Sequence, residues 1–396
     1  MSYFDQLVRA TQGQQLFDYQ PTGQVQRCQC GQAVFFNNTK CLRCGSELGY
    51  HPLQTSLFSL EPASEKGLWN LQKDTTEPKR SYQRCQNLTA PAACNWLVTG
   101  NSSEPFCLAC ALNETIPDLS LNENAELWHE TEVAKRRLVA QLLMLGLPVI
   151  PRSADPQQGM GFKFLRQQPG ADPVMTGHMD GIITLNIDEA DPAHRERMRK
   201  NMHEPYRTLL GHFRHESGHY YWDRLVRDTR WLEPCRELFG DDREDYQQAL
   251  KRHYNDGPPA NWKNHFISSY AATHPWEDWA ETWAHYLHMT DTLNAALDFG
   301  LQLDTLTLQT DPFDSSQLAA HEQGEDDRAR FLAFINRWVQ LSSVLNVLAR
   351  SMGQQDIYPF VLTVDSMRKL YLVHSVVASA GQAAPLAAAD ASIKPR

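Results

Sequence analysis

Two histidines and a glutamate stand at the spacing of the motif H-E-x-x-H, at His215, Glu216 and His219. Positions i and i+4 of a helix share a face, so both imidazoles can bind one zinc ion. Zinc lowers the pKa of a bound water towards neutrality, and Glu216 would lie beside that water as a general base. The motif therefore predicts hydrolytic chemistry. His212 lies on nearly the same face, and we interpret it as a structural or supporting residue, because only His215 and His219 bracket the glutamate correctly.

A catalytic zinc needs a third protein ligand and one open position. A helix is predicted over residues 275–289, with Pro275 at its start, and Glu277 and Glu281 face the same way on it. One glutamate can bind the zinc while the other accepts a hydrogen bond from a ligating imidazole. Spacing alone leaves open which of the two is the ligand. The alternative is that both are solvated charges on the helix surface.

Eight of the nine cysteines lie in two groups of four. The first group is Cys28, Cys30, Cys41 and Cys44, and the second is Cys85, Cys94, Cys107 and Cys110. Four thiolates are what a tetrahedral structural zinc requires, and a two-residue gap lets two sulfurs face one metal. We therefore predict two structural zinc ions besides the catalytic one. The second group is the weaker signal, because Cys85 and Cys94 do not form such a pair, and a redox role for a C-x-x-C pair is the alternative.

The fall in cysteine content places a domain boundary near residue 115. Residues 1–115 are predicted to form loops and short strands, with a short connecting helix over 59–74. Residues 116–380 are predicted to be mainly helical with a small β-sheet, and residues 381–396 to be a disordered tail. The elements predicted in the second domain are helices over 124–145, 203–227, 275–289, 328–352 and 364–378, and strands over 161–165 and 181–187. The fold class is α+β.

The net charge of −10 argues against a general nucleic-acid binder, because phosphate contacts need a basic face. Residues 1–115 contain nine Lys and Arg against nine Asp and Glu, so the cysteine-rich segment is neutral rather than basic. The first residues contain no apolar core of a secretory signal, and no apolar run reaches the roughly 18 residues of a membrane span. We therefore expect a cytoplasmic protein without a membrane partner, in which paired cysteines bind metal rather than form disulfides.

The H-E-x-x-H helix followed by E-x-x-A-E at Glu277 and Glu281 resembles the gluzincin metallopeptidases, including the anthrax lethal factor type. The resemblance implies that Glu277 is the third zinc ligand and that Glu281 hydrogen-bonds a ligating histidine. Those relatives place a tyrosine seven residues before the ligand glutamate, and Tyr270 holds that place here. By the same resemblance Tyr270 stabilises the oxyanion of the tetrahedral intermediate. The alternative for Tyr270 is a packing aromatic.

Most of residues 20–380 resemble a bacterial family of zinc-binding metallopeptidases that carry N-terminal zinc ribbons. The strings that carry this likeness are E-P-Y-R-T-L-L-G-H-F-R-H-E over 204–216 and P-W-E-D-W-A-E-T-W-A over 275–284. The resemblance implies a zinc-ribbon domain followed by a zincin-like metallopeptidase domain. It implies a reaction type but no particular substrate.

These observations lead us to expect a zinc-dependent metallopeptidase that hydrolyses a peptide or protein substrate. In zincins a strand before the motif helix borders the cleft, and the strand predicted over 181–187 would let an extended peptide pair with its edge. Three alternatives remain open. One is a docking or adaptor protein that binds a macromolecule through its zinc ribbons. Another is a DNA-associated protease, in which Phe35, Phe36 and Trp96 stack on bases. The third is hydrolysis of a non-peptide amide by the same chemistry.

Overall fold

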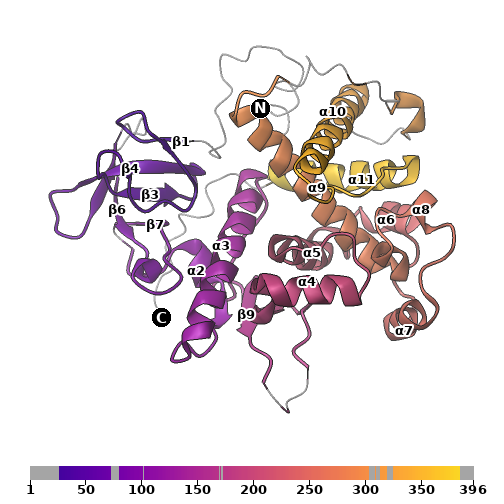
Figure 1. Ribbon diagram of the computed structural model, residues 1–396, viewed down its shortest axis with the longest axis horizontal. Coiled ribbons are helices and arrows are strands. Elements are labelled where there is room, and N and C mark those ends of the chain that lie inside the picture. Colours follow the sequence, from indigo (N-terminus) through magenta and orange to yellow (C-terminus); the bar gives the residue numbers. More distant parts are fainter. Residues whose placement is uncertain are drawn as a thin grey trace. The chain divides into compact units, whose positions relative to one another are not determined.

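The computed structural model describes residues 26–72, 80–100, 102–168, 170, 173–302, 308, 313–318 and 324–383. The chain divides into two compact units (Figure 1). One unit spans residues 20–202 and is called the N-terminal unit below, and the other spans residues 203–385 and is called the C-terminal unit. The disordered tail predicted over 381–396 lies largely outside the described residues.

The N-terminal unit begins with two antiparallel sheets. Strands β1 (Gln26–Arg27) and β2 (Ala33–Val34) form the first. The second is a meander of β3 (Leu48–His51), β4 (Ser56–Pro62), β5 (Trp69–Leu71), β6 (Ser81–Arg84) and β7 (Leu97–Thr99). Its core consists of Leu60, Leu71, Tyr82 and Leu97.

The connecting helix predicted over 59–74 is wrong, because β4 and β5 occupy this segment and pair in register from Leu60↔Leu71 to Pro62↔Trp69. Gly67, with φ +89°, lies in the turn between them. Leu57, Ser59 and Leu60 of β4 are buried, whereas Glu61 is exposed. This burial accompanies strand pairing and does not follow a helical period.

A four-stranded mixed sheet follows, in the order β10-β11-β9-β8. Its strands are β8 (Asn113–Thr115), β9 (Gly161–Leu165), β10 (Gly177–Met179) and β11 (Ile182–Asn186). The strand predicted over 181–187 is β11, which pairs with β9 on one side and β10 on the other. Its edges are therefore occupied, and the predicted pairing of a peptide with this strand is wrong for β11. Among the described residues, the edge strand on that side of the sheet is β10.

Helix α3 (Asn122–Met144) carries charged side chains into the interior of the N-terminal unit. Lys135 lies 2.7 Å from Glu132, Arg136 lies 3.7 Å from the same carboxylate, and the three side chains are at most 1% exposed. The guanidinium of Arg136 donates to the carbonyl of Ala92, which lies between Cys85 and Cys94. The buried charges thus hold α3 against the loop of the second cysteine group. The remaining helices of this unit are α2 (Leu108–Ala111), α4 (Pro192–Asn201) and the short turns at Gln86–Leu88 and Ile187–Ala190.

The C-terminal unit is helical. Its helices are α5 (Leu209–Tyr221), α6 (Leu232–Phe239), α7 (Tyr246–Asp256), α8 (Trp262–His265), α9 (Pro275–Asp298), α10 (Gly324–Ser351) and α11 (Val364–Ala383), with single turns at Tyr270–Thr273 and Ser315–Gln317. The helix predicted over 203–227 is shorter than expected. Its first turn begins after Thr208, whose hydroxyl accepts a hydrogen bond from the Gly211 amide. After Tyr221 it continues as a π-helical turn over Trp222–Val226.

Helices α5 and α9 pack directly on each other, and small and aromatic residues explain how closely (Figure 1). A Cβ at Gly218 would lie 2.9 Å from the Cα of Ala280, so only glycine allows this approach. The indole of Trp279 donates to the Gly218 carbonyl at 2.9 Å, and that of Trp283 donates to the Ser217 hydroxyl at 3.1 Å. The two x positions of the H-E-x-x-H motif are therefore occupied by residues that lock α5 to α9.

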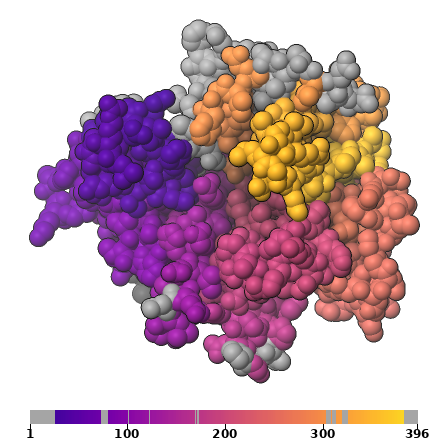
Figure 2. All heavy atoms as spheres, in the orientation of Figure 1, coloured from indigo at the N-terminus to yellow at the C-terminus, as the bar shows by residue number. Residues whose placement is uncertain are grey.

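Helix α10 is, in the described part of the chain, the one helix long and apolar enough to cross a membrane by length and composition, which the sequence did not lead us to expect. Core helices of water-soluble bundles pass the same test. Phe331, Phe334 and Trp338 of α10 are buried, and its contacts include α9 and α11. Residues near the C-terminal end of the described chain form part of the surface of this unit (Figure 2, orange to yellow).

Candidate metal centre

His215 and His219 project from α5 towards Glu277 in the first turn of α9. The Nε2 atoms of His215 and His219 lie 3.0 Å and 3.4 Å from the same oxygen, Oε2 of Glu277. One ligand atom from each residue lies within 4.8 Å of the others. His274 caps α9 by accepting from the Trp276 amide, and Pro275 starts the helix, so Glu277 is fixed within the first turn.

The three side chains fit a zinc ion. Bonds of about 2.0–2.1 Å in a tetrahedron place ligand atoms roughly 3.3 Å apart, close to the separations between the imidazoles and Glu277. Oε2 of Glu277 is buried and faces the two imidazole nitrogens, with no further partner among the described residues. A buried carboxylate oxygen costs free energy unless something compensates its charge, and a metal at this point does so.

Glu281 holds the imidazole of His215 from the other side. Its Oε1 lies 2.7 Å from Nδ1 of His215, and its Oε2 accepts a hydrogen bond from the Ser268 hydroxyl at 2.6 Å. A carboxylate that accepts from Nδ1–H leaves Nε2 with a free lone pair, which is the tautomer that a metal requires. The structure thus brings both predicted glutamates to the histidines, Glu277 to both Nε2 atoms and Glu281 to one Nδ1.

Other contacts orient α5. The indole of Trp276 lies over the ring of His219, with centroids 3.9 Å apart. Arg214, which precedes the motif, reaches His288 and Asp291 of α9, each at 2.6 Å. Arg214 is buried, so these contacts tie the face of α5 that carries the motif to the middle of α9.

Glu216 is buried, and its Oε2 has no hydrogen-bond partner among the described residues. Burial raises the pKa of this carboxyl, while the charges of His215 and His219 act in the opposite direction. A carboxyl with a raised pKa beside a metal centre suits transfer of a proton near neutral pH. His212 lies near enough for its charge to lower the pKa of Glu216, but it does not belong to the metal-ligand group.

The ligands perturb one another strongly. Burial alone would raise the pKa of Glu277, but the charges and hydrogen bonds of the two histidines hold it well below its ordinary value. Burial would lower the pKa of His215, but Glu277 and Glu281 raise it well above its ordinary value. Such opposed shifts are typical of sites where several ionisable groups converge.

Two tyrosines lie at the centre. The ring of Tyr270 is 5.9 Å from that of His215, so the predicted residue is beside the metal ligands. The second, Tyr246 at the start of α7, donates a hydrogen bond of 2.7 Å to Oε1 of Glu277. Sequence reasoning missed Tyr246, as it missed Ser268, because neither belongs to a motif and both reach the site only through the packing of other elements.

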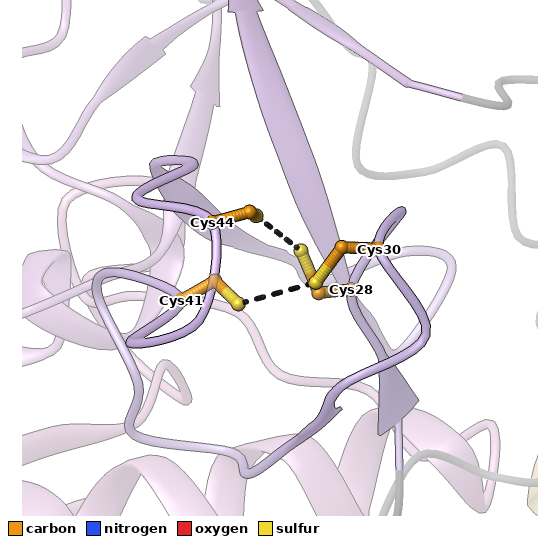
Figure 3. Close-up of side chains that lie close together, drawn as sticks. All are labelled: Cys28, Cys30, Cys41 and Cys44. Atoms are coloured by element: carbon orange, nitrogen blue, oxygen red, sulfur yellow. Dashed lines mark hydrogen bonds between the residues drawn. The ribbon is translucent and has the colours of Figure 1, made fainter.

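The sulfurs of each cysteine group lie close together, and Figure 3 shows the first group. The sulfurs of Cys28 and Cys44 are 3.5 Å apart and those of Cys30 and Cys41 are 3.7 Å apart. In the second group, Cys94 and Cys107 are 3.6 Å apart. Zinc–sulfur bonds of about 2.3 Å in a tetrahedron place sulfurs roughly 3.8 Å apart, so both groups fit structural zinc. A hydrogen bond from Ser46 lowers the pKa of Cys44 to about 6, which favours the thiolate that binds metal.

The exposure of three aromatic residues and one cysteine bears on the alternative functions. Phe36 and Trp96 are buried and cannot stack on bases as the DNA-associated alternative required, whereas Phe35 is exposed. Cys235 is fully buried, and burial raises its pKa, which makes it a poor nucleophile.

Comparison with known families divides the chain near residue 122, which lies inside the N-terminal unit. Residues 25–121 match a zinc-ribbon domain, which fits the strands and the two cysteine groups. The class that fold and site together define is a zinc-binding protein with an N-terminal zinc ribbon and an α+β architecture. Residues 124–376 match the family described as "Putative zinc-binding metallo-peptidase", and the chain belongs to this family.

Relatives over nearly the whole length are known from mycobacteria. The chain is 41% identical over 349 residues to uncharacterized proteins of Mycobacterium bovis and Mycobacterium tuberculosis. These matches cover 88% of this chain and 93% of each relative. No solved structure matches the chain.

Proposed function

We propose that the chain is a zinc-dependent metallopeptidase of the gluzincin type, which hydrolyses peptide bonds of peptide or protein substrates. The observation that carries this proposal is the convergence of His215 and His219 on one oxygen of Glu277, with the buried Glu216 beside them. The family supports a zinc-binding metallopeptidase in general terms, and the geometry supports the finer assignment.

Each residue of the centre has a separate role in the proposed hydrolysis. Zinc, bound by His215, His219 and Glu277, would supply Lewis acidity for the attacking water and for the substrate carbonyl. Glu216 removes a proton from the water as its oxygen adds to the carbonyl carbon, and then gives that proton to the nitrogen as the C–N bond breaks. The products are a carboxylate and an amine.

Two further residues assist in this scheme. In this proposal the hydroxyl of Tyr270, whose ring lies 5.9 Å from that of His215, donates a hydrogen bond to the oxygen on which negative charge develops. Glu281 keeps His215 in the tautomer whose Nε2 points at Glu277. The two cysteine groups hold zinc in a structural role, for a total of three zinc ions per chain.

The test is cleavage of a mixed-sequence peptide library by the full-length, zinc-loaded chain, with products identified by mass spectrometry. Glu216→Gln keeps the size of the side chain but removes the base, so we expect unchanged zinc content and turnover lower by about 10²–10⁴-fold. Glu233→Gln, the same substitution at an exposed position of α6, is the control and should leave turnover unchanged.

Near-normal turnover by Glu216→Gln would contradict the role proposed for Glu216. No cleavage by the wild-type chain, with zinc present in all three sites, would instead favour the docking or adaptor function through the zinc ribbons.

We propose a cytoplasmic location. We also propose a substrate that is not a nucleic acid, in keeping with the net charge of −10.

A further inference from the structure

Tyr246 reaches the metal centre from a helix that carries none of the motif residues. Its hydroxyl donates to Oε1 of Glu277 at 2.7 Å, while Oε2 of the same carboxylate faces His215 and His219. The two oxygens of Glu277 therefore have different partners, a phenol on one side and two imidazoles on the other.

This division has a consequence for coordination. A carboxylate can bind a metal through one oxygen or both, and a catalytic zinc must keep one position open for water or substrate. A donor that occupies one oxygen favours binding through the other alone. Residues that hydrogen-bond a ligand in this way fix its orientation and typically change metal affinity by about 10–100-fold.

We propose that Tyr246 is the positioning residue that commits Glu277 to binding zinc through Oε2 alone, and so keeps the open position of the centre. The inference rests on the proposed function in one respect, since it takes zinc to be the group that His215, His219 and Glu277 hold. It concerns metal binding, however, and can be tested without any substrate.

The surroundings of Tyr246 hold its ring in place for this role. Asp245 caps α7 by accepting from the Gln248 amide, so Tyr246 lies in the first turn of a well-formed helix. Its ring packs edge-on against His274 and Trp276, with centroids 5.4 Å and 5.8 Å away. Both of these neighbours flank the start of α9, which also carries Glu277.

Tyr270 does not share this role. Its ring lies 5.9 Å from that of His215, whereas the hydroxyl that donates to Oε1 of Glu277 belongs to Tyr246. Of the two hydroxyls, the one on Tyr246 orients a metal ligand, and the one on Tyr270 is left for the substrate.

The experiment measures zinc affinity of the full-length chain by competition with a chromophoric chelator, for wild type and Tyr246→Phe. Phenylalanine keeps the ring and removes only the donor. We expect the affinity of the histidine–glutamate site to fall by about 10–100-fold, with the zinc of the cysteine groups retained. Tyr254→Phe is the matched control, because Tyr254 lies on the same helix and is 58% exposed; its affinity should equal that of wild type.

Co²⁺ substituted at this site gives a readout that a purely structural role would not change. Loss of the donor lets both oxygens of Glu277 bind, which raises the coordination number, so the visible absorption of the Co²⁺ form of Tyr246→Phe should weaken relative to wild type. Zinc affinity within about twofold of wild type, together with an unchanged Co²⁺ spectrum, would overturn the proposal.

A second measurement avoids any risk to folding. Fluorotyrosine at position 246 of the otherwise native chain retains the hydroxyl, and its ¹⁹F resonance should shift when zinc is added to the metal-free protein. The same label at position 254 should shift much less. Equal shifts at both positions would contradict the proposal. Normal zinc affinity in a chain that cleaves no peptide would contradict the proposed function instead, so the two failures are distinguishable.

Discussion

The cysteine groups and the histidine–glutamate centre are candidate metal sites that are assembled in different ways. Cys28 and Cys44 are 16 residues apart, and short loops bring them together. His215 and Glu281 are 66 residues apart, and two packed helices bring them together. The first kind of site organises its own surroundings, whereas the second is organised by a core that exists around it.

The difference lies in what would hold each site without its ion. The sulfurs of the second cysteine group are buried close together, and a bound metal would neutralise their thiolate charges. Around the histidine–glutamate centre, Gly218, Trp279 and Trp283 join α5 to α9 independently of any ligand. Removal of metal should therefore unfold the zinc ribbon but leave the helical centre assembled.

The largest expected effect follows from this contrast. Cys94→Ser should remove one zinc and abolish cooperative unfolding of the N-terminal unit, because structural zinc supplies on the order of 10 kcal/mol to such small domains. His219→Ala should also remove one zinc but cost no more than about 3 kcal/mol of stability. Calorimetry with zinc analysis of both variants makes the comparison, and equal losses of stability would contradict it.

The buried charges of α3 give the next effect. Glu132→Gln leaves Lys135 and Arg136 buried without their counter-charge, and breaking such a group costs about 3–5 kcal/mol. Denaturant titration of the full chain measures this loss. Glu130→Gln, on the exposed face of the same helix, should change stability by less than about 0.5 kcal/mol. A small effect at Glu132 would show that water reaches these charges.

A pH effect of about 3 kcal/mol is expected from His285 of α9. Burial lowers its pKa to about 4 from an ordinary value of 6.5, and its Nδ1 is hydrogen-bonded to the hydroxyl of Tyr358 at 2.8 Å. Since the unfolded chain binds the proton first, this contribution is present above about pH 6.5 and is lost as the pH falls towards 4. His285→Gln should flatten the dependence of unfolding free energy on pH in that range. A slope identical to wild type would contradict the assignment.

Sequence patterns predicted the parts of the molecule whose residues lie close together in the chain. The helix of the H-E-x-x-H motif, the start of α9 at Pro275 and the two cysteine groups all follow from local spacing. The choice between Glu277 and Glu281 did not follow from spacing, because both face the same side of one helix. It required the resemblance to gluzincins. In the structure Glu277 lies next to Nε2 of His215, and Glu281 lies next to Nδ1 of the same ring.

The rest depended on tertiary packing. Tyr246 and Ser268 could not be predicted from the sequence. A hydrogen bond to a carboxylate that is distant along the chain produces no periodic pattern and no fixed spacing between residues. The segment 59–74 was mistaken for a helix, because its strands are fixed by pairing with neighbours. The position of β10 at the end of the strand order could not be predicted either, since strand order is a property of the whole sheet.

The most direct test of the central claim is the zinc content of the chain, purified without added metal, for wild type and His215→Ala. Elemental mass spectrometry should find three zinc ions per wild-type chain and two in His215→Ala, because the three groups are separate and the substitution touches one of them. The same zinc content in both proteins, unchanged after addition of zinc, would show that His215, His219 and Glu277 do not form a metal site.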